Sequence, residues 1–498
     1  MSSTPSESDG PRLSNAAVAA LLVAVAATRV LAFGACSIYD DAFITYRYAL
    51  NFAQGDGLVF NPGAAWEPVL GTTTPAYALL LGYLAHWSQD VSMVSRMVNV
   101  ACDVASAGAL ILMFDRRVRP ATLSVLGYAC LPQLLRISDG GMESPLFGFL
   151  ALAASLCTLR GRPLSAGVLA AACCTVRPEG VLLLVALAFE MRRSWRDLVR
   201  FAIPVGVIGI ASLAAIHSAY GDVIPQSVRA KSAMPPPAGG GVFVKRWLEI
   251  LGQAFLPHVL YLPLVPLVAW GLVRTLARQS PLRAFSLFAL AITASYLVAR
   301  PHLWGWYFFV PLVAWSAWLA EGIDAALAVV ERWRGRALVA PRLLRAAPIV
   351  LAFCAAAGVG VAAWVRPSPV PTNVYGPLQS WARETSTREP HARILASDIG
   401  AIGYAWKGVV LDSEGLTWPA ALAYRLPNRM IAELQPEYLL LVAEAPRIAH
   451  FYRRPDIYQL YEPIRRFSVV SETNLEPKLE ELPRTWRQDY IVYKKRAP

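Results

Sequence analysis

The sequence predicts a polytopic α-helical membrane protein of about ten spans, followed by a small C-terminal α/β domain. Three observations lead to this fold class. The 498-residue chain is 56% hydrophobic and only 16% charged, and its mean hydropathy of +0.43 is rare in a soluble protein of this length. Long apolar runs alternate with arginine-rich loops through most of the chain. After about residue 370 the apolar runs become short and strand-like.

The net charge of +12 limits the possible partners. In a soluble protein such an excess of basic residues would indicate nucleic-acid binding. Here the basic residues lie between the apolar runs, as the positive-inside rule predicts for a membrane protein, so membrane lipid and not nucleic acid is the expected partner. The seven cysteines lie in or beside apolar runs, and their spacing does not indicate a zinc site.

The N-terminal region leads into a polar loop that we expect to hold the active site. Residues 1–14 are rich in serine, proline and charge and are expected to be disordered. Residues 15–36 form the first predicted span, which contains Arg29. Directly after it, Asp40 and Asp41 begin a polar and aromatic loop, residues 37–90. Two adjacent carboxylates at the mouth of a membrane helix are costly unless they face water, pair or do chemistry.

The remaining apolar runs predict the rest of a transmembrane domain that covers residues 15–366. The segment 76–84 is too short to cross the bilayer and is expected to be interfacial or re-entrant. The crossing segments are expected at residues 91–114, 121–137, 144–159, 198–217, 255–273, 284–299, 308–320 and 346–364. With the basic loop after residue 114 in the cytoplasm, every basic-rich loop falls on one face, and loop 37–90 lies outside.

Residues 164–190 do not fit a single span. Basic residues bound this region on both sides, and its middle reads Arg177-Pro178-Glu179-Gly180. One long helix would place a basic cluster on each face of the membrane. We therefore expect two half-length helices joined at this sequence, because proline and glycine interrupt a helix and the freed backbone must be buried in protein or face water.

The C-terminal region, residues 370–498, predicts a separate domain outside the membrane. Strand-like runs occur at residues 393–396, 409–411, 438–442 and 490–493, and helical or turn stretches separate them. The predicted number of spans places this α/β domain on the same, extracytoplasmic side as loop 37–90.

Several motifs resemble those of the GT-C glycosyltransferases. The run from Asp40 to Ala49, with Asn51, the turn Phe60-Asn61-Pro62-Gly63 and then Glu67, resembles the first external loop of this superfamily. The resemblance is greatest to the mycobacterial cell-wall arabinofuranosyltransferase type. The Arg177–Gly180 turn and the stretch Asp398–Tyr404 are also similar to that group. One departure concerns Glu67, which is followed by Pro68 where relatives often have glycine, and this makes Glu67 a secondary candidate.

The resemblance implies an integral-membrane enzyme of the inner (plasma) membrane. It would move a sugar, arabinofuranose or a hexose, from a polyprenyl-phosphate donor to a cell-envelope glycan, lipid or protein outside the cytoplasm, with inversion. An aspartate of the first external loop would be the general base, since an acceptor hydroxyl is a weak nucleophile. Asp40 and Asp41 both match this role, and the neighbour of the base could bind acceptor or a divalent metal ion, or hold the loop.

Positive charge or a metal ion is also expected where the lipid phosphate leaves. The candidates for contact with donor phosphate or substrate are Arg29, Arg47, Arg177, Glu179, Arg300, His302, Tyr307 and Glu67. Lys231 also lies on the expected outer side. For each cation, an anchoring or ion-pairing role is the alternative. For Tyr307, the alternative is an interfacial aromatic belt.

Another function class remains open from the sequence. A transporter or flippase of lipid-linked saccharides could use the 164–190 region as a broken helix at its binding site. Such a protein is expected to have paired halves, which the sequence does not show. The sequence also has no glycine-rich nucleotide-binding loop after a strand, which argues against a nucleotide-sugar donor.

Overall fold

The long apolar runs of the chain fold into helices. The first, α1 (Asn15–Leu31), begins after Ser14, whose hydroxyl accepts a hydrogen bond from the Ala17 N–H at 3.2 Å and so satisfies one of the free amides of the first turn. The computed structural model describes residues 11–33, 38–63, 67–233, 264–277, 280–299, 304–335, 341–365, 374–424, 427–442, 454–467 and 490–497.

The chain divides into two units, each made of three separate stretches. Unit 1 contains residues 1–36, 95–212 and 236–367, and unit 2 contains residues 37–94, 213–235 and 368–498. The predicted loop 37–90 and the predicted C-terminal domain 370–498 therefore fall in the same unit.

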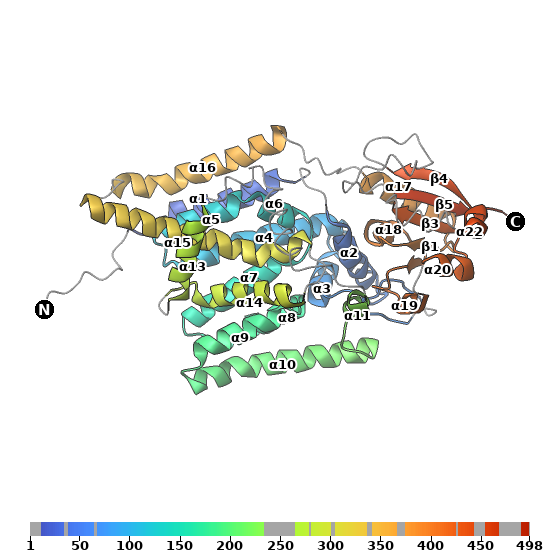
Figure 1. Ribbon diagram of the computed structural model, residues 1–498, viewed down its shortest axis with the longest axis horizontal. Coiled ribbons are helices and arrows are strands. Elements are labelled where there is room, and N and C mark those ends of the chain that lie inside the picture. The colour runs from blue at the N-terminus through green and yellow to red at the C-terminus, as the bar shows by residue number, and fades with distance from the viewer. Residues whose placement is uncertain are drawn as a thin grey trace. The chain divides into compact units, whose positions relative to one another are not determined.

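Unit 1 is a bundle of helices (Figure 1). After α1, its members are α4 (Val91–Met113), α5 (Val118–Cys130), α6 (Pro132–Asp139), α7 (Ser144–Leu159), α8 (Pro163–Val176), α9 (Gly180–Met191), α10 (Trp195–Tyr220), α13 (Val265–Leu276), α14 (Arg283–Ala299), the 3-10 helix η2 (Gly305–Phe308), α15 (Phe309–Arg334) and α16 (Pro341–Val365). The first residues of α4 and the last turns of α10 belong to unit 2.

Fewer helices than expected have the length of a full span. Within the described residues, α4, α10 and the stretch Gly305–Arg334 are long and apolar enough to cross a membrane, and α6 with α7 adds a fourth if this pair, bent by 114°, counts as one span. The other apolar stretches have 10–17 residues, where only residues 346–359 of the longer helix α16 are counted. At 1.5 Å per residue, such stretches are shorter than a hydrocarbon core of about 30 Å. The prediction of ten spans is therefore not confirmed.

Two predicted spans differ from the observed helices. The predicted crossing 121–137 is interrupted at Leu131, where α5 ends and Pro132 starts α6, because proline has no N–H to continue the helix. The predicted segment 308–320 is much longer than expected. It continues as α15 to Arg334 and ends at Gly335, which has a left-handed φ of 65°. Most of predicted span 255–273 lies outside the described residues.

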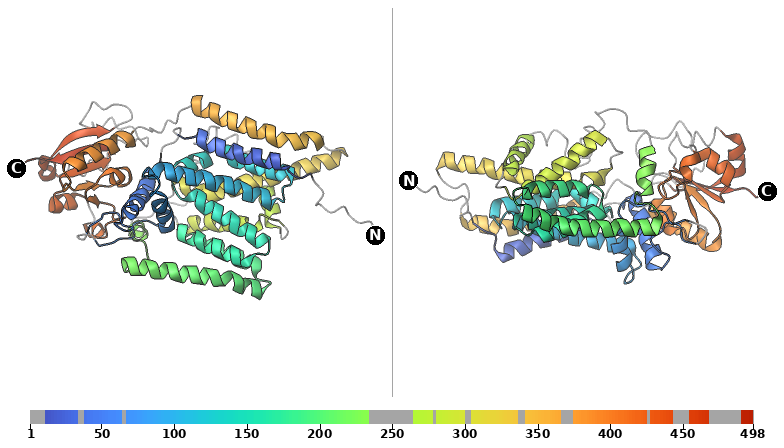
Figure 2. Two further views of the ribbon diagram at one scale, coloured as in Figure 1. Left: turned by 180° about the vertical axis from the view of Figure 1, so that it is seen from behind. Right: turned by 90° about the horizontal axis from the view of Figure 1, so that it is seen from below.

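The predicted break in residues 164–190 is present. Helix α8 ends at Val176 and α9 starts at Gly180, and the two helices lie side by side (Figure 1 and Figure 2). A β-carbon on Gly180 would lie 2.7 Å from the Cys174 nitrogen, so the turn is too tight for a larger residue. Two helices of 14 and 12 residues thus replace one span, as the Arg-Pro-Glu-Gly sequence predicts.

Unit 2 combines a mixed sheet with short helices. The helices are α2 (Asp40–Ala53), α3 (Pro75–Leu84), α11 (Gln226–Ala233), α17 (Tyr375–Arg388), α18 (Gly400–Ala405), α19 (Ala421–Tyr424), α20 (Pro427–Leu434) and α22 (Pro455–Leu460). The strands are β1 (Ile394–Ala396), β2 (Val410–Asp412), β3 (Tyr438–Val442), β4 (Tyr461–Phe467) and β5 (Tyr490–Lys495). Their order is β2-β1-β3-β5-β4, with β1 parallel to β2 and β3, and β5 antiparallel to β3 and β4.

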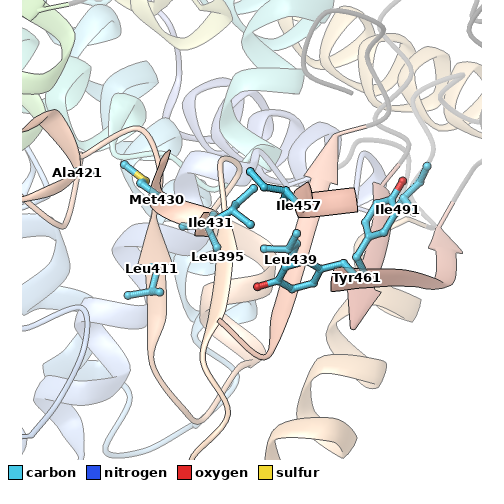
Figure 3. Close-up of a cluster of buried hydrophobic side chains, with 10 residues drawn as sticks. Leu395, Leu411, Ala421, Met430, Ile431, Leu439, Ile457, Tyr461 and Ile491 are labelled. Carbon is cyan, nitrogen blue, oxygen red and sulfur yellow. The ribbon is translucent and has the colours of Figure 1, made fainter. Parts of the chain in front are cut away.

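A hydrophobic core lies between this sheet and two of the helices. Leu395, Leu411 and Leu439 of the parallel strands pack with Met430 and Ile431 of α20. Figure 3 shows the cluster, in which Ile457 of α22 also points toward the strands. Alternate residues of each strand supply these side chains, as expected for a sheet covered on this face by helices.

Each of the four predicted strands overlaps an observed one, but β4 was not predicted. This strand contains Glu462, Pro463, Arg465 and Arg466, and it is the last strand at one edge of the sheet. Proline and charged residues are tolerated at a sheet edge, where they discourage pairing with other chains, and they remove the apolar signal by which a strand is detected.

Candidate active site

The start of α2 carries both predicted acids. Asp40 and Asp41 are the first two residues of this helix, where the exposed N–H groups and the helix dipole favour negative charge. Both side chains are partly exposed. Helix α2 then becomes largely buried from Ala42 to Ala49, so the acids stand where a buried helix reaches solvent.

Asp40 makes a two-point contact with the start of α18. Its Oδ2 accepts from the Gly400 N–H at 2.9 Å, and its Oδ1 accepts from the Ala401 N–H at 2.8 Å. A β-carbon on residue 400 would lie 1.8 Å from the carbonyl oxygen of Asp40, so this approach requires glycine. Asp40 therefore ties α2 to the C-terminal part of unit 2.

Asp41 has different surroundings. Loss of solvation raises the pKa of the Asp41 carboxyl, the positive charge of Lys231 in α11 lowers it, and the negative charge of Asp398 raises it, with a net increase. Loss of solvation also raises the pKa of Asp40, and Asp398 adds to this increase against the two backbone N–H groups. A carboxylate with a raised pKa next to a lysine suits general-base chemistry near neutral pH.

Asp398 completes this acidic cluster, and the sequence analysis did not select it as a site residue. It lies two residues after β1, and its Oδ2 accepts a hydrogen bond from the Tyr490 hydroxyl of β5 at 3.1 Å. The motif Asp398–Tyr404 could have indicated this residue. A carboxylate followed by glycine at the end of a buried strand is typical of sites at the carboxyl edge of parallel strands.

Arg47, a predicted phosphate ligand, donates hydrogen bonds to other groups of unit 2. Its Nη1 donates to the carbonyls of Gly403 and Trp406, its Nη2 donates to the Asn61 Oδ1 and the Gly408 carbonyl, and its Nε donates to the Phe60 carbonyl. These bonds use all five N–H groups of the guanidinium. Contact between Arg47 and a donor phosphate would therefore require the loss of at least one of these hydrogen bonds.

Glu67 lies on a separate cavity of unit 2. Its side chain is exposed and, with Asn61 and Trp418, it lines a space of about 480 Å³. Glu67 is thus not part of the acidic cluster formed around Asp41.

Three other predicted residues meet in unit 1. The Nη1 of Arg177 donates to Glu143 and its Nη2 to Glu179, each at 2.8 Å, and the guanidinium carbon lies 4.9 Å from the ring centre of Tyr307. The Tyr296 hydroxyl donates to the same Glu179 oxygen at 3.2 Å. This network satisfies charges that would otherwise be costly at the tip of the α8–α9 turn.

Arg29 forms a second buried network in unit 1. Its Nε lies 2.5 Å from the Asp103 carboxylate, and its Nη1 and Nη2 donate to the carbonyls of Ala129 and Tyr128. An ion pair of this kind holds α1 against α4 and α5. Arg300 and His302, the last two predicted ligands, lie outside the described residues.

The described residues give little support to a metal site. Among them, no group of three or more histidine, cysteine, aspartate or glutamate side chains is arranged to hold a metal ion.

Comparison with known proteins identifies the fold. The model of glycosyltransferase family 87 matches residues 72–301, and that of a domain of unknown function matches residues 372–493. The apo structure of ArnT from Cupriavidus metallidurans has a TM-score of 0.63 and 12% identity, and the alignment covers 96% of this chain and 97% of that one. The match to glycosyltransferase family 87 over residues 72–301, together with this fold, supports a GT-C-type membrane glycosyltransferase.

One other comparison supports this fold. The archaeal oligosaccharyltransferase AglB from Archaeoglobus fulgidus has a TM-score of 0.55 and 11% identity, over 96% of this glycosyltransferase and 75% of AglB. The arabinofuranosyltransferase AftD from Mycobacteria has a TM-score of only 0.49 and matches over 40% of its own length, from which we draw no conclusion about the sugar. No curated protein matches the sequence.

Proposed function

We propose that this glycosyltransferase moves a sugar from a polyprenyl-phosphate donor to a cell-envelope glycan, lipid or protein on the extracytoplasmic face of the inner membrane. A lipid-phosphate donor is supported by two neighbours of the same fold. One structure of ArnT contains undecaprenyl phosphate, and the structure of AglB contains dolichol-phosphate. The proposal includes arabinofuranose and a hexose as alternative sugars.

The observation that carries the mechanism is the difference between the two acids. Both carboxylate oxygens of Asp40 accept backbone hydrogen bonds. The pKa of Asp41 is instead lowered by the positive charge of Lys231 and raised by the negative charge of Asp398. We therefore assign Asp41 as the general base and Asp40 as the residue that positions it. Arg29, Arg177, Glu179, Arg300, His302 and Tyr307 remain candidates for contact with the donor.

The proposed reaction is a single displacement. Asp41 takes the proton of the acceptor hydroxyl as that oxygen attacks the anomeric carbon from the face opposite the phosphate. The bond between the anomeric carbon and the phosphate oxygen breaks, and the electron pair leaves with polyprenyl phosphate. Inversion follows from this geometry. Lys231 is suited to offset the negative charge near Asp41 as the phosphate leaves.

The test is release of polyprenyl phosphate by the purified, full-length protein. We expect release from a polyprenyl-phosphate sugar only when a glycan acceptor is present. Asp41→Asn keeps the size of the side chain and removes the base, so transfer should fall by about 10²–10⁴-fold. Asp56→Asn makes the same change at an exposed position of the same loop and should leave transfer unchanged.

Two outcomes would contradict this function. Wild-type turnover by Asp41→Asn would remove the base from this position. Movement of the intact lipid-linked sugar across a vesicle membrane, with no release of polyprenyl phosphate, would instead support a flippase.

A further inference from the structure

The cavity beside Glu67 has a lining that is built from two distant parts of unit 2. Residues 59–61, 67 and 69 follow α2, and residues 417–420 follow β2. Its volume of about 480 Å³ is in the range of small-molecule sites. Glu67, Pro419 and Ala420 are exposed, so the cavity is reached from solvent.

One wall of the cavity is fixed by Asn61. Its Oδ1 accepts from the Arg47 Nη2 and from the Val410 N–H, both at 3.1 Å, and its Nδ2 donates to the Val410 carbonyl at 2.9 Å. The amide thus joins the loop after α2 to the first residue of β2. Because Arg47 is held in turn by four backbone carbonyls, this wall is rigid before any ligand binds.

The part of the lining formed by residues 417–420 is held by Asp412, the last residue of β2. Its Oδ1 accepts from the N–H groups of Glu414 and Gly415, and its Oδ2 accepts from the N–H and hydroxyl of Thr417. Gly415 adopts a φ of 77° within this turn. A buried carboxylate with four donors therefore sets the position of Thr417 and of Trp418, which follows it.

The chemistry of the lining selects a class of ligand. Among the lining residues that the structure describes, Glu67 is the one ionisable side chain, so a phosphate or another anion would be repelled. Trp418 is partly exposed and packs against Tyr424, with 6.1 Å between the ring centres. An indole face packs on the C–H face of a sugar ring, and a carboxylate accepts hydrogen bonds from sugar hydroxyls.

We propose that this cavity is a subsite for a neutral oligosaccharide, which holds the part of the acceptor that does not react. This inference rests on the proposed function and adds the acceptor class to it. Arg47, which borders the cavity through Asn61, lies six residues after Asp41, or about 9 Å along α2. A sugar bound in the cavity would therefore lie away from the base. This is the position expected for a sugar unit of the acceptor that does not itself react.

The proposal is tested by binding of saccharides to the full-length protein in detergent. The probes are a neutral arabinofuranose oligosaccharide, a neutral mannose oligosaccharide and an anionic oligogalacturonate, with affinities measured by calorimetry and saturation-transfer NMR. We expect at least one neutral probe to bind and the anionic probe not to bind. Trp418→Ala should weaken binding about tenfold, and Glu67→Gln, an exposed change that does not threaten folding, about threefold.

Two variants serve as matched controls in the same unit. Trp87 has 70% of its surface exposed and lies outside the cavity lining, and Asp56 is an exposed acid of the same loop as Glu67. Trp87→Ala and Asp56→Asn should bind the neutral probe as the wild type does. Failure of every neutral probe to bind, tighter binding of the anionic probe, or equal binding by Trp418→Ala, Glu67→Gln and wild type would overturn the subsite.

Activity separates this inference from the proposed function. Asp41→Asn should abolish transfer and keep saccharide binding, whereas Trp418→Ala should raise the acceptor KM and keep kcat. Saccharide binding without any release of polyprenyl phosphate would remove the proposed function and leave a sugar-binding cavity. Transfer with an unchanged acceptor KM in both Trp418→Ala and Glu67→Gln would remove the subsite and leave the enzyme.

Discussion

The buried charged groups of unit 1 are paired with opposite charges, whereas three carboxylates interact in unit 2. In unit 1, Arg29 faces Asp103 at 2.5 Å, and Arg177 binds Glu143 and Glu179 at 2.8 Å. In unit 2, loss of solvation and the charge of Asp398 raise the pKa values of Asp40 and Asp41, and Lys231 offsets only part of this effect on Asp41. Compensated charges hold helices together, whereas a cluster of like charges costs stability and is a mark of chemistry. This contrast supports the proposal that the general base lies in unit 2.

The largest structural effect should come from breaking a compensated network. Arg177→Ala leaves Glu143 and Glu179 without their cation, and loss of one partner of a buried pair costs about 3–5 kcal/mol. Arg193→Ala removes an exposed arginine and should change stability by less than about 0.5 kcal/mol. Thermal unfolding in detergent measures both. Equal, small shifts in Tm would show that the α8–α9 turn does not depend on its charges.

The contact between Asp40 and α18 should be the next most sensitive. Gly400→Ala would place a methyl group 1.8 Å from the Asp40 carbonyl oxygen, so α18 must move, at a cost of about 1–3 kcal/mol. Transfer should fall with it, because Asp40 loses its backbone donors. Gly376→Ala is the matched control, since a methyl group there meets no atom within 4 Å. Turnover and Tm that are alike in the two variants would argue against a positioning role for Asp40.

The smallest effect is a shift in the pH dependence of transfer. A general base must be deprotonated, so the rate should rise with pH through the raised pKa of the Asp40–Asp41 pair. Lys231 lowers the pKa of Asp41, and Lys231→Gln should therefore move this acid limb to higher pH. Exposed Lys407→Gln is the control. An acid limb that stays in place, or moves to lower pH, would separate Lys231 from the base.

Stability should change with pH in the opposite direction to activity. The folded state binds protons at Asp40 and Asp41 more tightly than the unfolded chain, whose aspartates have ordinary pKa values. Their contribution to stability is therefore complete below the ordinary aspartate pKa and is lost as pH rises through the raised values.

Local features of the chain were predictable from sequence. The Arg-Pro-Glu-Gly break, the four apolar strands and the placement of Asp40 and Asp41 directly after the first helix depend on residues close together in the chain. The roles of Arg47 and Asp398 were not predictable, because their partners are far away in the sequence. Arg47 binds the carbonyl of Gly403, 356 residues away, and no local pattern distinguishes an arginine held by carbonyls from one free to bind phosphate. The predicted number of spans is not confirmed, because helix breaks such as that before Pro132 shorten the apolar helices of the described residues.

The hydrogen bonds from Gly400 and Ala401 to Asp40 can form only late in synthesis of the chain. Asp40 and Gly400 are 360 residues apart, so α2 must wait for most of the chain to be made before it gains these partners. At about 5–20 residues per second, this interval is roughly 20–70 s. A nascent or truncated chain that lacks α18 has the acid pair but not the backbone groups that position it. Synthesis of the C-terminal part therefore acts as the final step of active-site assembly.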